Sequence, residues 1–228
     1  TTAPANRAAA RAADGVEIRG LREGRCITRV PDVLTETQFE GAPPQVEALD
    51  AGTDLVTLSI GGNDVGFGAI VACITRQGPF ESLPGEATCE SQIGDTIAAD
   101  IAAVYGADGP VDAVYDTISE LSPDATVVAT RYMPLMPAEG TTCAFTDRLN
   151  PADVAWARQV TDDINRAVDE AATRNGHVSV MPTDDVDRSA CAEPDQRWTS
   201  FLGDPDTAPM HPTALGQEAM AAAIAAAI

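Results

Sequence analysis

Apolar and polar positions follow two patterns along the chain, one typical of buried strands and one typical of amphipathic helices. Runs of apolar and β-branched residues predict strands at 16–19, 54–60, 125–130 and 178–181. The clearest helix is predicted over 151–175, where an apolar residue recurs every three or four positions and forms one stripe. The members of that stripe are Val154, Ala157, Val160, Ile164, Val168 and Ala171.

The remaining elements are shorter. We predict helices at 4–14 and 65–73, a helical turn at 45–49, one helix over 93–121 interrupted near 106–110, and a last helix from Pro212. Segments 21–40 and 183–209 are predicted to be irregular. Strands that alternate with helices indicate a parallel sheet covered on both faces. The fold class is therefore α/β, a three-layer αβα sandwich in a single domain over 1–228.

The stretch from Asp54 to Asp64 ends a predicted buried strand in Gly61-Gly62-Asn63-Asp64. Glycines let the backbone turn sharply at the carboxyl end of a parallel strand, which is where ligands bind in open α/β sheets. The Asn63 amide could stabilise an oxyanion there, or Asn63 or Asp64 could cap the next helix. Ser59 is expected inside the buried strand.

The chain contains two histidines. His177 stands between Gly176 and a predicted strand, and we interpret it as structural. His211 stands on a predicted loop directly before the last helix, from which it could reach a pocket at the edge of the sheet. His211 is therefore a candidate functional residue.

These motifs carry a family resemblance. Leu58-Ser-Ile-Gly-Gly-Asn-Asp-Val-Gly-Phe67 resembles the G-x-N-D block of the SGNH (GDSL-type) hydrolases, and His211-Pro-Thr-Ala-Leu-Gly216 resembles their catalytic histidine block. The segment 42–50 resembles the secreted actinobacterial lipase/esterase branch. From about Ala42 onward the likeness is specific, and before that it fades.

The resemblance implies roles for individual residues. His211 would deprotonate a serine and later protonate the leaving alkoxide, and Asn63 would donate to the oxyanion. The backbone N–H of Gly24 is the candidate second donor. The family usually orients its histidine with an aspartate three residues earlier, where this chain has Ala208. A backbone carbonyl of Ala208 or Pro209 could replace that aspartate, and Asp206 and Asp204 are the side-chain alternatives.

The nucleophile departs from the family pattern. The family carries its serine in a G-D-S motif after the first strand, and this sequence contains no Gly-Asp-Ser. The predicted helix at 4–14 resembles the helix that follows that motif. The resemblance thus implies a flavodoxin-like sheet whose first, central strand is missing, and a domain that is incomplete at its N-terminus.

The five cysteines include no C-x-x-C pair, so a zinc ribbon or thioredoxin motif is not expected. We predict disulfides Cys73–Cys89 and Cys143–Cys191 in an exported protein, and the resemblance implies the same pairing. Cys26 is then left over, as a free thiol or with a partner outside this chain.

Composition limits the partners. The net charge is −21, and all 14 basic residues are arginine, which argues against nucleic acid or an anionic membrane surface as a standing partner. We expect a secreted, monomeric hydrolase of carboxylic esters, acting on lipid or small ester substrates without cofactor, metal or membrane insertion. The alternative is a non-catalytic relative that binds a lipid or glycan in the same pocket.

Overall fold

The computed structural model describes residues 28–37, 41, 43–84, 87–203 and 208–228. Several predictions concern residues outside this set: the helix at 4–14, the strand at 16–19, Gly24, Cys26, Asp204 and Asp206. The described helices are α1 (Val30–Leu34), α2 (Phe67–Ile74), α3 (Cys89–Tyr105), α4 (Pro110–Leu121), α5 (Pro151–Arg174) and α6 (Ala214–Ala227). Short 3₁₀ turns are η1 (Gln45–Ala48), η2 (Gly78–Phe80) and η3 (Thr146–Arg148).

The three main strands form one parallel sheet, as predicted, and lie in the order β1-β2-β3. β1 (Leu55–Leu58) pairs with β2 (Thr126–Thr130), and Leu58 lies opposite Ala129. β2 pairs in turn with β3 (Val178–Val180), and Thr130 lies opposite Val180. The carboxyl ends of all three strands therefore meet at one edge of the sheet.

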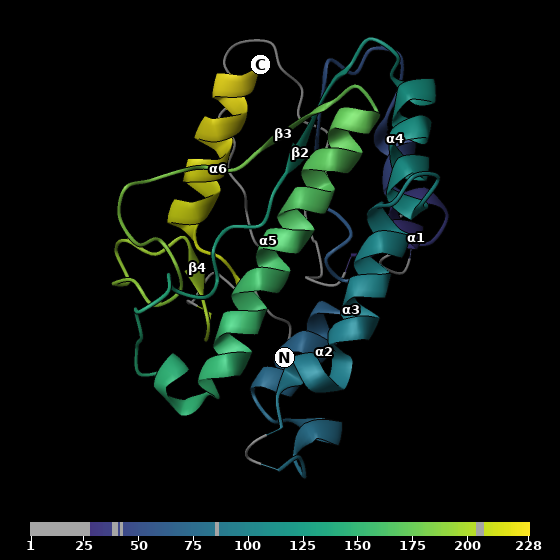
Figure 1. Cartoon of the computed structure of the whole chain (residues 1–228). Coiled ribbons are helices and arrows are strands. Elements are labelled where there is room, and N and C mark those ends of the chain that lie inside the picture. The colour runs from purple at the N-terminus through teal and green to yellow at the C-terminus, as the bar shows by residue number, and fades with distance from the viewer. Residues whose placement is uncertain (1–27, 38–40, 42, 85–86, 204–207) are drawn as a thin grey trace.

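Helices cover both faces of this sheet. Because side chains alternate between faces along a strand, Val127 and Ala129 join the core cluster under α2–α5, whereas Val128 and Val180 pack with Met220 of α6. Figure 1 shows α3 and α5 side by side, with α6 apart from them beyond the strands. The predicted three-layer αβα fold is confirmed.

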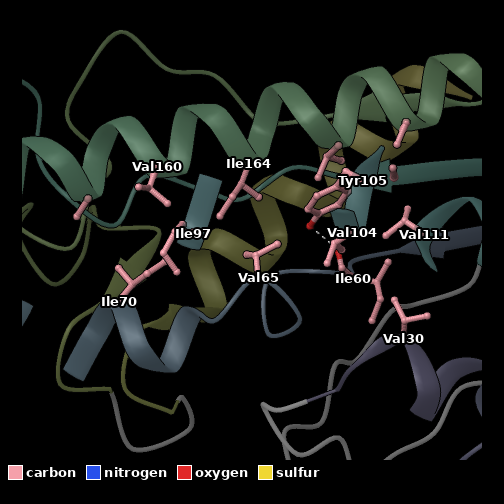
Figure 2. Packing of buried hydrophobic residues seen from close by; sticks show 14 of the residues in the cluster. Val30, Ile60, Val65, Ile70, Ile97, Val104, Tyr105, Val111, Val160 and Ile164 are labelled. Carbon is pink, nitrogen blue, oxygen red and sulfur yellow. Dashed lines mark hydrogen bonds between the residues drawn. The ribbon is translucent and has the colours of Figure 1, made fainter. Parts of the chain in front are cut away.

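α5 forms from local signals that the sequence already shows. The Asn150 side chain accepts the N–H of Ala152 at 2.9 Å, Pro151 opens the helix, and Gly176 follows its end with φ +77°. All six residues of the predicted apolar stripe are buried. In Figure 2, Val160 and Ile164 of this stripe face Ile97 of α3 and Val65 in the same core cluster.

The prediction of one interrupted helix over 93–121 is wrong, because α3 and α4 are separate helices that pack against each other. α3 starts earlier than predicted, at Cys89, where the Thr88 hydroxyl accepts the N–H of Ser91 at 3.2 Å. Gly106 is extended and ends α3, and Pro110 opens α4.

Two segments predicted to be irregular contain elements. α1 lies within 21–40, and the carboxylate of Asp64 accepts the N–H of Val30 at its start. Segment 183–209 contains β4 (Thr199–Ser200), which pairs antiparallel with β5 (His211–Pro212). Because Pro212 belongs to β5, α6 begins at Ala214 with Thr213 as its cap, two residues later than predicted.

β1 is more exposed than predicted. Leu55 is 40% exposed and Ser59 is also exposed, so the prediction that Ser59 lies inside a buried strand is wrong. Among the described residues β1 has a strand partner on one side only, which leaves its other edge uncovered by them. No helix in the described part of the chain is long and apolar enough to cross a membrane.

A polar cluster ties the end of α5 to the start of α4. Arg174 donates to both carboxylate oxygens of Asp112 at 2.7 and 3.0 Å, and Asn175 donates to Asp112 at 2.7 Å. Burial alone would raise the pKa of Asp112, but these hydrogen bonds and the N–H of Asp108 outweigh it and lower that pKa.

This cluster gives a pH-dependent contribution to stability. Because the folded pKa of Asp112 is depressed, its contribution is fully present above the unfolded pKa of about 3.9 and is lost as pH falls through the folded value. Asp112→Asn should therefore cost about 1.5–3 kcal/mol at pH 7, the worth of hydrogen bonds to a charged group. Urea unfolding from pH 7 to pH 2 should show the gap between wild type and variant closing, and a constant gap would contradict the assignment.

Candidate active site

A cleft of about 520 Å³ opens at the carboxyl ends of β1 and β2, beside α6. Its wall includes Asn63, which follows β1, and His211 of β5. These two residues were predicted from the sequence as candidate site residues. They are 148 positions apart in the chain, and the fold brings both to the wall of one cavity. A second cavity of about 500 Å³ adjoins it and shares Tyr132, Leu135 and Thr161.

Two tyrosines hold the glycine turn at the end of β1. Tyr132 accepts the N–H of Gly62 at 2.8 Å, and Tyr105 donates to the carbonyl of Ile60 at 2.8 Å (Figure 2). Gly61 has φ +99°, and a Cβ there would overlap the Tyr105 hydroxyl, so only glycine fits. Burial raises the pKa of both tyrosines, so their phenol groups stay neutral.

Asn165 of α5 fixes the backbone of Tyr132 from both sides. Its Oδ1 accepts the N–H of Tyr132 at 2.6 Å, and its Nδ2 donates to the Tyr132 carbonyl at 2.9 Å. Tyr105, Tyr132 and Asn165 were not predicted from the sequence, because the turn that they support is distant from them in the chain. The one local signal was the position of Tyr132 two residues after a predicted strand.

The residues after the glycines have different partners. The Asn63 amide donates to the carbonyl of Thr28 at 3.0 Å. Asp64 accepts the N–H of Val30, and burial raises the pKa of Asp64 despite that hydrogen bond. The N-cap of α2 is Gly66, so the alternative that Asn63 or Asp64 caps this helix is wrong.

His211 is oriented by a backbone carbonyl. Its Nδ1 lies 2.7 Å from the carbonyl oxygen of Pro209. A carbonyl only accepts, so Nδ1 carries the proton and the lone pair stays on Nε2, as a general base requires. Of the two carbonyls that the sequence left open, Pro209 rather than Ala208 makes this contact, and Asp206 lies outside the described residues.

The segment that carries His211 is anchored on both sides. Across the β4–β5 pair, His211 lies opposite Ser200. After it, Thr213 donates its N–H to Trp198 and its hydroxyl to Arg197, each at 2.8 Å. Gly216 is required because a Cβ there would lie 2.9 Å from the carbonyl carbon of Trp198. This close approach explains the glycine of the His-Pro-x-x-x-Gly pattern.

His177 has the structural surroundings that were predicted for it. Its ring packs at 5.0 Å from that of Tyr115, and burial lowers the pKa of His177. It does not line either cavity. Within the described ranges, no group of three or more His, Cys, Asp or Glu residues could hold a metal ion.

Both predicted disulfides are present in the structure. Cys73–Cys89 joins α2 to the start of α3, and Cys143–Cys191 joins the loop after β2 to the loop before β4. The Thr146 hydroxyl lies 3.8 and 3.9 Å from the two sulfur atoms of the second bridge, which ties these two long loops together.

The chain is similar to several Streptomyces proteins. It is 34% identical to Lipase 2 of Streptomyces coelicolor over 82% of this chain and 64% of that protein, and 30% identical to a lipase of Streptomyces rimosus over 76% and 59%. This chain thus spans less than two thirds of the length of these relatives.

Two solved Streptomyces structures have a similar fold. The extracellular lipase of Streptomyces rimosus superposes with a TM-score of 0.65 at 27% identity, covering 88% of this chain and 77% of that one. Phospholipase A1 of Streptomyces albidoflavus NA297 has a TM-score of 0.59 at 22% identity over 88% and 76%, a likeness of fold. The family model described as "GDSL-like Lipase/Acylhydrolase family" matches residues 3–219. With this match, the cleft residues and the fold, the chain belongs to the GDSL-like lipase/acylhydrolase family.

Proposed function

We propose that this chain provides the base and an oxyanion donor of a secreted hydrolase that cleaves carboxylic esters through a serine acyl-enzyme. The observation that carries the proposal is the cleft shared by Asn63 and His211, with the His211 Nδ1 proton held by Pro209. In this mechanism Nε2 of His211 takes the proton of the attacking serine and returns it to the leaving alkoxide. The Asn63 amide stabilises the negative oxygen that forms between these steps.

The cleft residues that match the family do not include a nucleophilic serine. The chain contains no Gly-Asp-Ser, and among the described residues the outer edge of β1 has no strand beside it. We propose that the nucleophile is a serine at the end of a further strand that pairs with this edge. Such a strand would place its carboxyl end beside Asn63, because parallel strands end at the same edge.

The proposal also covers where the protein acts and which esters it cleaves. Two disulfides and the extracellular relative support export from the cell. The cleft wall is mostly apolar, with Ile60, Met133 and Met220 among its residues, which suits the acyl chain of a lipid or a small ester. We expect the protein to act as a monomer and without a cofactor.

Asn63→Ala in the complete gene product tests the oxyanion role. It should lower kcat for p-nitrophenyl butyrate by about 10²–10³-fold, the effect of removing one such donor. Asn175→Ala, which changes an amide remote from the cleft, serves as the matched control and should leave kcat unchanged. An Asn63 variant that is folded and has wild-type kcat would overturn this assignment.

The absent Gly-Asp-Ser favours one alternative, a relative that binds a lipid or glycan in this cleft without cleaving it. A complete gene product that is folded, binds hexanoate and hydrolyses no ester would establish that alternative. Hydrolysis by the 228-residue chain that is lost in Ser59→Ala would instead identify Ser59, which is exposed on the cleft wall, as the nucleophile.

A further inference from the structure

Arg131 differs from the other residues around the cleft. It directly follows β2 and lines the same cavity as Asn63 and His211. Among the described residues of that wall, it is the only side chain with a permanent charge. The neighbouring wall is apolar and includes Leu58, Met133, Met220 and Ile224.

The guanidinium of Arg131 has no acidic partner among the described residues. Its Nε is shut off from solvent and meets no hydrogen-bond acceptor. By contrast, Arg76, Arg174 and Arg188 each pair with an aspartate at 2.7–3.0 Å.

A guanidinium without an acidic partner keeps donors for an incoming acceptor, and hydrogen bonds to a charged group are among the stronger ones. A guanidinium is also the side chain best suited to phosphate and carboxylate, because its planar donors match two oxygens at once. The cleft therefore combines a cation that lacks an acceptor with a wall suited to hydrocarbon.

We propose that Arg131 binds an oxyanion of the substrate, so that the preferred substrates are amphiphilic esters that carry a phosphate or carboxylate group. This inference rests on the proposed ester hydrolase function and adds the substrate class. The net charge of −21 repels anions at long range, so a local cation is what makes an anionic substrate acceptable here.

The test compares esters that differ only in the anionic group, using the complete gene product. One pair is p-nitrophenyl hydrogen adipate against p-nitrophenyl hexanoate, for carboxylate. The other is dihexanoylphosphatidic acid against dihexanoylglycerol, for phosphate. Arg131→Gln should lower kcat/KM for an anionic member about tenfold or more, roughly one charge-assisted hydrogen bond, and leave the neutral members within about twofold.

Two further variants sharpen this comparison. Arg131→Lys keeps the charge and should retain part of the preference, and Arg166→Gln, an exposed arginine of α5, should change nothing. The pair that responds identifies the source of the oxyanion. Equal losses on anionic and neutral esters, or no loss on either, would overturn the proposal.

A binding measurement keeps the inference separate from the proposed catalysis. Hexyl phosphate should raise the melting temperature of the wild-type protein and not that of Arg131→Gln, and hexanol should do neither. Without ligand, Arg131→Gln should melt at or above the wild-type temperature, because no partner is lost. A drop of several degrees would show a structural role. If no ester is cleaved, the function fails while this binding result still decides the role of Arg131.

Discussion

Replacing His211 by alanine in the complete gene product should lower kcat for ester hydrolysis by about 10²–10⁴-fold, the usual contribution of a general acid–base group. The expected loss is large because, in the proposed mechanism, His211 acts twice, first on the nucleophile and then on the leaving group. Its Nδ1 is held by the Pro209 carbonyl at 2.7 Å, so none of the described aspartates is needed to orient it. Steady-state kinetics with p-nitrophenyl butyrate measures the effect.

His177→Ala is the matched control for this experiment. His177 packs against Tyr115, away from both cavities, so its loss should change stability more than kcat. A His211 variant with wild-type kcat would remove the base from the mechanism. Since no aspartate of the described residues contacts His211, substitution of a described aspartate such as Asp187, which lines the adjoining cavity, should leave kcat unchanged.

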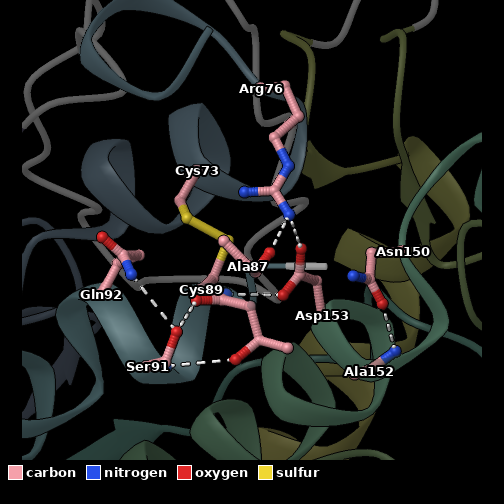
Figure 3. Close-up of polar contacts among 10 residues, drawn as sticks. Cys73, Arg76, Ala87, Cys89, Ser91, Gln92, Asn150, Ala152 and Asp153 are labelled. Carbon is pink, nitrogen blue, oxygen red and sulfur yellow. Dashed lines mark hydrogen bonds and ion pairs between the residues drawn. A yellow bond between two sulfur atoms is a disulfide. The ribbon is translucent and has the colours of Figure 1, made fainter. Parts of the chain in front are cut away.

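Asp153→Ala should lower the free energy of unfolding by about 3–5 kcal/mol, the range for removing one partner of a buried ion pair. Asp153 is fully buried in the first turn of α5. Its carboxylate accepts the N–H of Cys89 at 2.6 Å and the guanidinium of Arg76 at 3.0 Å, and Arg76 also donates to the Ala87 carbonyl (Figure 3). The variant leaves a cation and a backbone N–H without their acceptor.

Urea unfolding with the disulfides intact measures this loss, and two variants interpret it. Asp163→Ala, on the same helix in an exposed ion pair with Arg166, should leave the unfolding midpoint unchanged. The double variant Asp153→Ala/Arg76→Met should lose less free energy of unfolding than the two single variants lose together, because Asp153→Ala has already left the cation unpaired. A loss below about 1 kcal/mol for Asp153→Ala would show that the pair does not hold α5 to the Cys73–Cys89 bridge.

Local patterns determined much of the fold. The stripe of α5, its Asn150 cap and the three described main strands were all readable, because helix and strand periodicity involve residues close in sequence. The glycine turn after β1 and the His-Pro-x-x-x-Gly pattern likewise identified Asn63 and His211 before any contact was known.

What the sequence could not show depends on partners that are distant in the chain. β4 and β5 are two residues each, too short to have a period, and they form because Ser200 and His211 meet. Likewise, Pro209 was one of several possible partners for His211 until the structure placed its carbonyl at 2.7 Å.

The site shows the same division. The motifs around Asn63 and His211 predicted the candidate catalytic residues, because each motif involves residues close in the sequence. The support of the turn by Tyr132 and the unpaired state of Arg131 could not be predicted, because each depends on which side chains the tertiary structure brings near. The sequence by itself determined the three main strands, the long helix α5 and the candidate catalytic residues. Only the tertiary structure decided the shorter elements and how the site is held, since packing and hydrogen bonding join segments that no local pattern connects.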